Sequence, residues 1–253
     1  MAYKEILGID FGGSGIKGAP VDTKKGVLTA ERHRIVTPEP ASPESVVEVI
    51  EQIADHFNWT GPIGIGFPAA VQNGVVKTAS NIDKKWIGVN AQNIVSERLN
   101  VPVCVVNDAD AAGFAEMKFG RGKKHMGTVL LITIGTGIGT VLFSGGELVA
   151  NTELGHLYLN NGREAEEFAA DSARQRDELD WTEWGTRFNV YLNEMHKLFW
   201  PELIIVGGGV SKKPEKFIHT IDVPSEIVMA KLKNEAGIIG AALAARKFVK
   251  KSR

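Results

Sequence analysis

An apolar strand that ends in a glycine-rich turn and returns as a second strand occurs twice in this chain. The first copy spans residues 6–13 and continues as a strand over 16–21. The second spans 129–136, near the start of the other half, and continues over 139–143. The repeat predicts two similar α/β domains that face each other across a central cleft. The alternative is that two ordinary glycine hairpins have converged on one pattern.

Strands and helices alternate along the rest of the chain, which favours an α/β protein with largely parallel central strands. Apolar, β-branched runs predict buried strands at Glu5–Asp10, Ile63–Phe67, Val101–Val106, Thr128–Ile134 and Leu203–Val206. Pro43 follows Ser42, an N-cap residue type, so a helix is expected to begin there. Further helices are expected at Asn90–Leu99, Asp108–Phe119, Gly162–Glu178, Thr186–Phe199 and Glu235–Lys250.

Composition excludes several classes of protein. The 253 residues include 29 basic and 30 acidic side chains, whereas nucleic-acid and membrane-surface proteins are usually more basic. We therefore expect neither partner. The chain has a single cysteine, Cys104, which rules out an internal disulfide and a cysteine-cluster zinc site and fits the cytoplasm. The longest uncharged stretch, 127–146, is interrupted by threonines and glycines and is interpreted as strands rather than a membrane span.

The first glycine turn has the residue types of a phosphate-binding loop. Glycines leave backbone N–H groups free to converge on an anion, while Ser14 adds a hydroxyl and Lys17 a positive charge. Asp10 ends the preceding strand and would hold Mg²⁺ beside the phosphates. The alternative is a tight hairpin capped by Asp10. The candidate phosphate-binding residues here are Asp10, Gly12, Gly13, Ser14, Gly15 and Lys17.

Two further glycine runs lie in the second half of the chain. The turn at 133–140 offers three threonine hydroxyls and three glycines, and the triple glycine 207–209 follows the strand at 203–206. Each run alone has a packing explanation, but three in one chain favour a phosphate-rich ligand. The candidates here are Thr133, Gly135, Thr136, Gly137, Gly208 and Gly209.

Polar residues at the end of a buried strand form the best candidate for catalysis. Asn107 and Asp108 follow the strand at 101–106, and Asp110 lies in the helix that begins there. Open α/β sheets bind ligands at this end of their strands. A helix N-terminus also keeps a carboxylate ionised, as a proton acceptor must be. The alternative is that Asn107 or Asp108 only caps the helix.

Glu153 and His156 are three residues apart, a spacing that suits hydrogen bonds to neighbouring hydroxyls of one sugar. A metal-ligand pair is the alternative, although no further His or Cys lies at ligand spacing. Asn81 has an amide suited to the same work, or it is a turn residue. Basic clusters are interpreted as solvated faces or as a guide for a long polyanion. They comprise Lys84 and Lys85; Lys118, Arg121, Lys123 and Lys124; Lys212 and Lys213; and Arg246, Lys247, Lys250, Lys251 and Arg253.

The motifs at 10–17, 107–112, 133–139, 153–156 and 207–211 occur in the order found in the ROK (repressor, open reading frame, kinase) sugar kinases, which the chain resembles from Ile6 to Ala245. The resemblance implies the actin-like, ribonuclease-H-like fold, with a sugar between two α/β domains. It also implies that the last helix returns to the first domain. We therefore expect an N-terminal domain of 1–108 joined by helix 236–253, and a C-terminal domain of 109–235.

Within this family the chain is most similar to the polyphosphate glucokinases, with which it shares the stretch 81–86 and Ser211-Lys212. Many ROK proteins carry a cysteine-rich zinc motif after the Gly-His pair, but 157–175 contains no cysteine, so no zinc is expected. The first strand starts near Glu5, so we expect no preceding DNA-binding domain. Ser14 replaces the more usual threonine, and Phe67–Ala70 has alanine where the family often has glycine.

The resemblance implies phosphoryl transfer from polyphosphate or ATP, with Mg²⁺, to the 6-hydroxyl of glucose, and a homodimer. Asp108 would be the general base, and Asn81, Asn107, Glu153 and His156 would bind the other hydroxyls. Glu166 is the best match for a further sugar-binding glutamate, with Glu164 and Glu167 left open. The alternatives are an ATP-dependent hexokinase for glucose, mannose or N-acetylhexosamine, and a non-catalytic sugar sensor. A dinucleotide fingerprint at 13–18 has the right spacing but is followed by a predicted strand instead of a helix.

Overall fold

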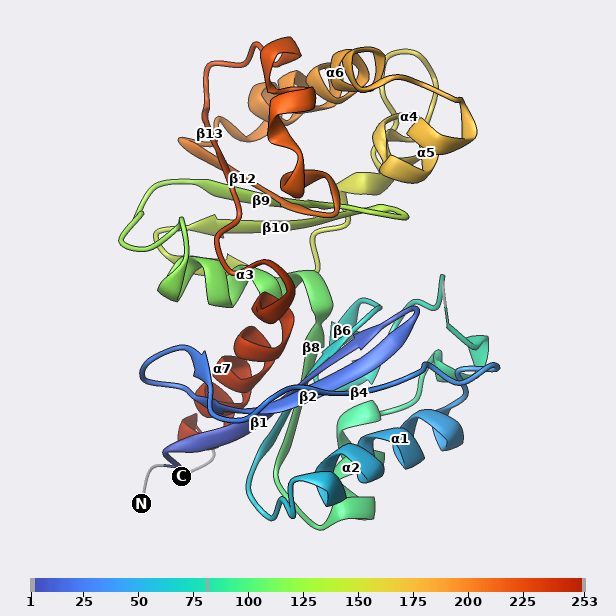
Figure 1. The fold of residues 1–253 in the computed structure, drawn as a ribbon, viewed down its shortest axis with the longest axis vertical. Coiled ribbons are helices and arrows are strands. Elements are labelled where there is room, and N and C mark those ends of the chain that lie inside the picture. The colour runs from blue at the N-terminus through green and yellow to red at the C-terminus, as the bar shows by residue number, and fades with distance from the viewer. Residues whose placement is uncertain (1–2, 81, 252–253) are drawn as a thin grey trace. The chain divides into compact units, whose positions relative to one another are not determined.

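The chain divides into two compact units. The computed structural model describes residues 3–80 and 82–251. Unit 1 comprises Met1–Ala115 and Asn234–Arg253, and unit 2 comprises Glu116–Lys233 (Figure 1). The units part within helix α3 (Asp108–Phe119), whereas the sequence placed the boundary at the start of this helix. The chain passes between the units twice. The two ends of unit 2 are joined by a hydrogen bond, because the Leu232 N–H donates to the carboxylate of the buried Glu116 at 2.6 Å.

Unit 1 is built on a sheet with strand order β3-β2-β1-β5-β8, in which β4 also pairs with β2. Its strands are β1 (Glu5–Gly12), β2 (Gly15–Asp22), β3 (Val27–Leu28), β4 (His33–Ile35), β5 (Ile63–Phe67) and β8 (Val103–Asn107). A small separate pair is formed by β6 (Val71–Gln72) and β7 (Val75–Val76). The β1–β2 hairpin is antiparallel, whereas β1, β5 and β8 run parallel. Their carboxyl ends therefore meet at one edge of the sheet.

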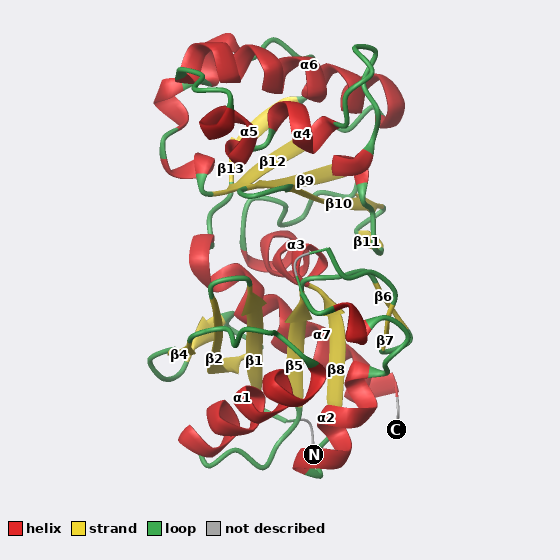
Figure 2. Ribbon diagram, turned by 90° about the vertical axis from the view of Figure 1, so that its right-hand side faces the viewer, coloured by secondary structure: helices red, strands yellow, loops and turns green. Residues whose placement is uncertain are grey.

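Helices cover both faces of this sheet (Figure 2). Helices α1 (Pro43–His56) and α2 (Ala91–Leu99) lie on one face, and α7 (Ala236–Lys251) lies on the other. Ser42 caps α1 as predicted, because its hydroxyl accepts the N–H of Ser45. Trp86, from the stretch shared with the polyphosphate glucokinases, is fully buried and donates to a backbone carbonyl at 3.0 Å, so it is a core residue.

Glycines let α7 lie directly on the sheet. A Cβ on Gly8 of β1 or on Gly64 of β5 would fall 2.0 or 1.9 Å from a carbonyl oxygen of α7. Gly240 of α7 repeats this close approach on α3, where a Cβ would fall 1.6 Å from the Ala111 oxygen. No larger residue fits these contacts without moving a backbone. They fix the first turn of α3 relative to the sheet.

Unit 2 repeats the sheet topology of unit 1, with strand order β11-β10-β9-β12-β13. Its strands are β9 (Val129–Ile134), β10 (Ile138–Ser144), β11 (Glu147–Val149), β12 (Leu203–Gly208) and β13 (Glu226–Met229). Helices α4 (Ala165–Ala169), α5 (Asp171–Arg176) and α6 (Trp181–Phe199) pack on one face. Each unit thus opens with an antiparallel hairpin whose first strand pairs in parallel with the next long strand. This confirms the repeat predicted from the sequence.

The single helix predicted over Gly162–Glu178 is wrong. The chain is extended at Ala170, between α4 and α5, and the Gly135 carbonyl accepts the N–H groups of the next two residues. Helix α6 also begins at Trp181, earlier than predicted, because Asp180 caps it in a capping box. Within residues 3–80 and 82–251, no helix has the length and apolar character needed to cross a membrane.

Candidate active site

The first glycine turn forms the tip of the β1–β2 hairpin in unit 1. Gly12 pairs with Gly15, and Gly13 and Ser14 are exposed between them. The Thr37 hydroxyl donates to the Gly12 carbonyl at 2.6 Å and so holds the base of the turn. The tip leaves its backbone accessible to an anion, as the phosphate-binding interpretation requires.

A row of three charged residues crosses the sheet beside this turn. Asp10 is paired with Lys17 across β1–β2, and Lys17 is paired with Arg34 across β2–β4, so the three side chains share one face. The Lys17 Nζ lies 3.5 Å from the Asp10 carboxylate. Burial raises the pKa of Asp10, and the positive charge of Lys17 partly offsets this rise. The carboxylate also faces the N-terminal turn of α7, where a Cβ on Gly237 would fall 2.8 Å from it.

Sequence reasoning missed Arg34. Its guanidinium donates to the Ser14 carbonyl at 2.5 Å, and a Cβ on Gly15 would fall 2.5 Å from its Nε, so the side chain lies along the glycine turn. It is exposed. Strand β4 is three residues long and was not predicted, and nothing local in the sequence indicates that it pairs with β2. The turn therefore has two cations beside it instead of one.

Asn107 and Asp108 lie at the same edge of the unit 1 sheet as Asp10, since β1, β5 and β8 are parallel neighbours. The Asn107 amide accepts the N–H of Asp110 at 3.0 Å and donates to the Ala69 carbonyl at 3.1 Å. Asn107 thus caps α3, as the alternative interpretation held. The amide nitrogen of Asn107 keeps one further N–H to donate, and its amide oxygen can accept one further hydrogen bond.

Asp108 is the first residue of α3 and is partly exposed. Its Oδ1 accepts the N–H of Ala109 at 2.8 Å. A carboxylate at a helix N-terminus is stabilised in its charged form by the helix dipole. The local geometry therefore suits a proton acceptor.

In unit 2, three carboxylates surround His156. We call Glu153, His156, Glu164 and Glu166 the acidic cluster. The His156 Nδ1 lies 2.5 Å from Glu164 and 3.9 Å from Glu166. Burial lowers the pKa of His156, but the hydrogen bond to Glu164 and the neighbouring carboxylates raise it by more, so the net shift is upward. Burial also raises the pKa of Glu153, against the effect of His156. An imidazole among carboxylates offers both donors and acceptors to a polyol.

The structure distinguishes the surroundings of Glu164, Glu166 and Glu167, the three glutamates among which the sequence did not choose a sugar-binding residue. Glu164 and Glu166 face His156, whereas the backbone carbonyl of Glu167 is bound by arginine side chains. Glu166 also accepts the Ile138 N–H at 3.3 Å, and a Cβ on Gly137 would fall 2.5 Å from it. It therefore joins the acidic cluster to the second glycine turn. Asn81 lies outside the described residues.

The second and third glycine runs lie side by side at one edge of the unit 2 sheet. Gly207 and Gly208 of β12 pair with the end of β9, and the Gly209 N–H donates to the Ile134 carbonyl at 2.9 Å. Gly208 has φ +79°, and a Cβ there would fall 2.2 Å from the same carbonyl. Thr133 lies in β9, and Gly135, Thr136 and Gly137 form the adjoining turn between β9 and β10. Two runs that the sequence treated separately form one surface.

The basic clusters of unit 2 differ in their position on this sheet. Lys212 and Lys213 are exposed and follow the triple glycine, at the carboxyl end of β12. Residues 121–124 instead precede β9 and lead into the opposite edge. Among the residues that the structure describes, no group of three or more His, Cys, Asp and Glu side chains has the arrangement of a metal site.

Comparison with known proteins finds similarity to the ROK family in sequence and in structure. The model of the ROK family matches residues 6–175. The polyphosphate glucokinase of Mycobacterium tuberculosis (strain CDC 1551 / Oshkosh) is 44% identical over 239 residues, which cover 94% of this chain and 90% of that protein.

Two solved structures are similar over nearly the whole chain. The inorganic polyphosphate/ATP-glucomannokinase of Arthrobacter sp. strain KM has a TM-score of 0.90 and 45% identity, covering 95% of this chain and 98% of that one. A ROK family glucokinase from Streptomyces griseus, solved with glucose and AMPPNP, has a TM-score of 0.80 and 25% identity, covering 96% and 99%.

Proposed function

The chain belongs to the ROK family, and from this membership we propose that it is a kinase that transfers a phosphoryl group from inorganic polyphosphate to the 6-hydroxyl of glucose. The observation that carries the proposal is the 44% identity to a polyphosphate glucokinase over 94% of the chain. ATP is proposed as a second donor, since the similar Arthrobacter enzyme is named for both. The actin-like, ribonuclease-H-like sugar kinase fold accords with this activity.

Asp108 is assigned as the general base. Its carboxylate takes the proton of the 6-hydroxyl as the oxygen bonds to phosphorus, while the bond from phosphorus to the leaving phosphate oxygen breaks. The helix N-terminus favours the ionised form that this step needs, and the exposure of Asp108 permits contact with substrate. A positioned base of this kind contributes about 10²- to 10⁴-fold to the rate.

The remaining hydroxyls of glucose are assigned to the acidic cluster, to Asn107 and to Asn81. Glu153 and Glu166 accept hydrogen bonds from hydroxyls, and His156 donates one. Glu164 holds His156 through its Nδ1 and leaves Nε2 for the sugar. Since Asn107 already caps α3, it contributes only the donor and the acceptor position that remain.

The phosphoryl donor is assigned to the glycine turns of both units, with Lys17 and Arg34 beside the first. Phosphoryl transfer depends mainly on positioning and on charge stabilisation, which backbone N–H groups and these cations supply. Asp10 fits Mg²⁺, because magnesium is commonly held by one or two carboxylates together with water and substrate phosphates. When bound there, Mg²⁺ would neutralise charge on the donor phosphates.

The test is a direct assay of glucose 6-phosphate formation by the purified protein with Mg²⁺. Long-chain polyphosphate and ATP are compared at matched phosphate concentration, with glucose, mannose and N-acetylglucosamine as acceptors. Faster turnover of glucose with polyphosphate is expected. Turnover with ATP alone would replace the donor assignment, and glucose binding without turnover would favour a sugar sensor.

We also propose a homodimer in the cytoplasm. Trp200 and Leu198, 72% and 52% exposed at the end of α6, offer an apolar surface for a second copy. Cys104 is buried and its pKa is raised to about 12 by that burial, which suits a structural thiol in a reducing compartment. Light scattering coupled to size exclusion measures the mass in solution.

A further inference from the structure

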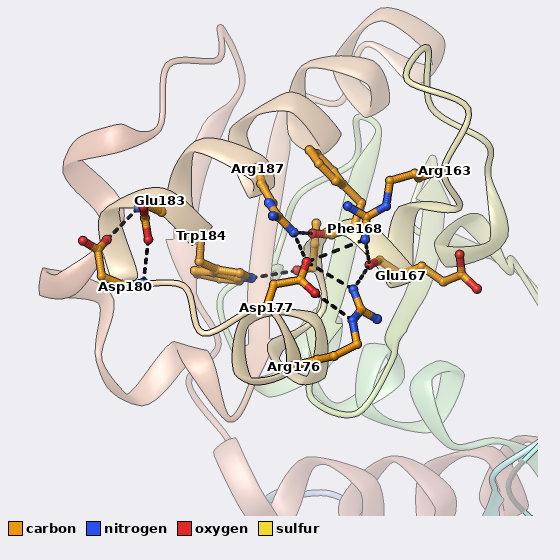
Figure 3. Close-up of polar contacts among 10 residues, drawn as sticks. Arg163, Glu167, Phe168, Arg176, Asp177, Asp180, Glu183, Trp184 and Arg187 are labelled. Carbon is orange, nitrogen blue, oxygen red and sulfur yellow. Dashed lines mark hydrogen bonds and ion pairs between the residues drawn. The ribbon is translucent and has the colours of Figure 1, made fainter.

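Three arginines converge on one carboxylate in unit 2 (Figure 3). Asp177 follows α5 and accepts hydrogen bonds from Arg176 Nε at 2.8 Å and from Arg187 Nη1 at 2.5 Å. The Arg163 Nη2 lies 3.7 Å from the same carboxylate. These arginines come from the loop before α4, the end of α5 and helix α6. We call the four residues the Asp177 cluster.

The same guanidinium groups bind the end of α4. Arg163 and Arg176 both donate to the Glu167 carbonyl, at 2.8 and 2.7 Å, and Arg187 donates to the Phe168 carbonyl at 3.5 Å. Arg163 and Arg187 also lie over the Phe168 ring, 5.3 and 5.0 Å from its centroid. Helix α4 has five residues, too few to be stable alone, and its last carbonyls have no partners within the helix. The arginines supply partners for the Glu167 and Phe168 carbonyls, and Trp184 Nε1 donates to the Ala169 carbonyl at 2.9 Å.

Helix α4 in turn carries two members of the acidic cluster. Glu164 is its N-cap residue, and Glu166 lies in its first turn. Both face His156, and Glu166 also accepts the Ile138 N–H. A displacement of α4 would therefore move two carboxylates away from the imidazole.

Asp177 is the carboxylate that offsets the positive charges of the three arginines in its cluster. The four side chains hold three positive charges and one negative charge. Hydrogen bonds from Arg176 and Arg187 hold the pKa of Asp177 well below its usual range, so the carboxyl group is ionised at neutral pH. Without this carboxylate, repulsion among the three guanidinium groups would weaken their hydrogen bonds to the two carbonyls of α4.

We propose that Asp177 is a positioning residue for the sugar: it gathers the three arginines on α4 and thereby fixes Glu164 and Glu166 against His156. The effect on glucose rests on the proposed function. The effect on the acidic cluster does not, because it follows from the contacts within unit 2.

The chain offers a matched control in Asp180, three residues further on (Figure 3). Asp180 caps α6 and accepts the N–H groups of Thr182 and Glu183 at 2.8 Å each. It lies in the same unit and also stabilises a helix, but its side chain accepts these hydrogen bonds from the first turn of α6 and not from α4. Asp177→Ala is expected to raise the glucose KM about tenfold with the polyphosphate KM within twofold of wild type. Asp180→Ala is expected to lower the Tm and leave both KM values unchanged.

A second readout needs no turnover. The neighbouring carboxylates Glu153, Glu164 and Glu166 hold the pKa of His156 above its ordinary value. If Asp177 positions α4, Asp177→Ala lowers the pKa of His156 in an NMR titration, and Asp180→Ala does not. The resonance is identified by its loss in His156→Gln, since the chain has six histidines. A wild-type protein that does not phosphorylate glucose would contradict the proposed function but leave this titration decisive.

The proposal is overturned if Asp177→Ala and Asp180→Ala have the same glucose KM and the same His156 titration. If the Asp177→Ala variant does not fold, the same measurements are made on the Arg176→Gln variant. Arg176 is 52% exposed and donates to both Asp177 and the Glu167 carbonyl. Its removal should shift the glucose KM and the His156 pKa in the same directions by smaller amounts, and an unchanged Arg176→Gln would likewise overturn the proposal.

Discussion

Asp108 is the residue on which the proposed chemistry depends most. Asn at this position keeps the size of the side chain and an oxygen for the Ala109 N–H, but it cannot take a proton at neutral pH. Asp108→Asn should therefore lower kcat about 10²- to 10⁴-fold. Glucose binding should change little, as measured by calorimetry. Asp55→Asn, an exposed change in α1 of the same unit, serves as the control. Near-normal turnover of Asp108→Asn would remove the assignment of the base.

Arg34 tests the donor side of the first glycine turn. A charge-assisted hydrogen bond contributes about 1.5–3 kcal/mol, so losing one to a donor phosphate should raise the polyphosphate KM about 10- to 100-fold. Arg34→Ala is expected to show this change with the glucose KM unaltered in steady-state kinetics. Arg98→Ala removes an arginine of the same unit that pairs with Glu51, and should alter neither value. A polyphosphate KM that is equal in the two variants would leave Arg34 as a support for the turn only.

Single residues differ in how well their sequence context predicts their position in the structure. The place of Asp108 after a buried strand and at the start of a helix was predictable, because both are local signals. The place of Arg34 was not, since it depends on the pairing of a three-residue strand with β2. The roles of Glu164 and Glu166 also depend on how α4 is turned toward His156, which the sequence pattern does not contain.

At the scale of elements, the contact between α7 and α3 gives a test in which two effects oppose each other. Helix propensity alone predicts that Gly240→Ala stabilises α7 by about 1 kcal/mol. The new Cβ would, however, fall 1.6 Å from the Ala111 carbonyl oxygen, and overpacking of this kind costs about 1–3 kcal/mol or more. We expect the cost of the steric overlap to exceed the gain in helix propensity. Gly240→Ala should therefore have a lower free energy of unfolding in urea, and a lower kcat because α3 carries Asp108.

Gly61→Ala is the matched control for Gly240→Ala in unit 1. The atoms nearest to its Cβ would be those of the Trp59 ring, at 3.4 Å, which is an ordinary contact, so the free energy of unfolding should stay within about 0.5 kcal/mol of wild type. If Gly240→Ala proved as stable as Gly61→Ala, the close packing of α7 on α3 would not constrain the start of α3.

Elements with a strong periodic pattern were predictable, and elements set by distant contacts were not. Both hairpins and the strands at 63–67 and 203–206 follow from apolar, β-branched runs. The segment 162–178 has helical spacing throughout, yet the Gly135 carbonyl breaks it at Ala170 by accepting the next two N–H groups. That carbonyl belongs to the second glycine turn, so the break depends on tertiary structure.

At the scale of the whole molecule, the net charge of −1 gives no general attraction for a polyanion. Binding of polyphosphate must come from local groups of cations, and salt screens these beyond about 10 Å at 0.1 M ionic strength. Lys212 and Lys213 adjoin the glycine runs of unit 2, whereas residues 121–124 lead into the opposite edge of that sheet. The structure thereby distinguishes two basic clusters that the sequence alone ranked equally.

This distinction predicts a difference in salt dependence. The polyphosphate KM should rise steeply with KCl between 50 and 200 mM, and the ATP KM should rise less because ATP reaches fewer cations. By analogy with single-stranded nucleic acids, each phosphate contact adds about 0.7 to the slope of log KM against log salt. The double variant Lys212→Ala/Lys213→Ala should therefore lower this slope by about 1.4, and Lys123→Ala/Lys124→Ala should leave it unchanged. The opposite ranking would place the polyanion at the other edge of the unit 2 sheet, away from the glycine runs.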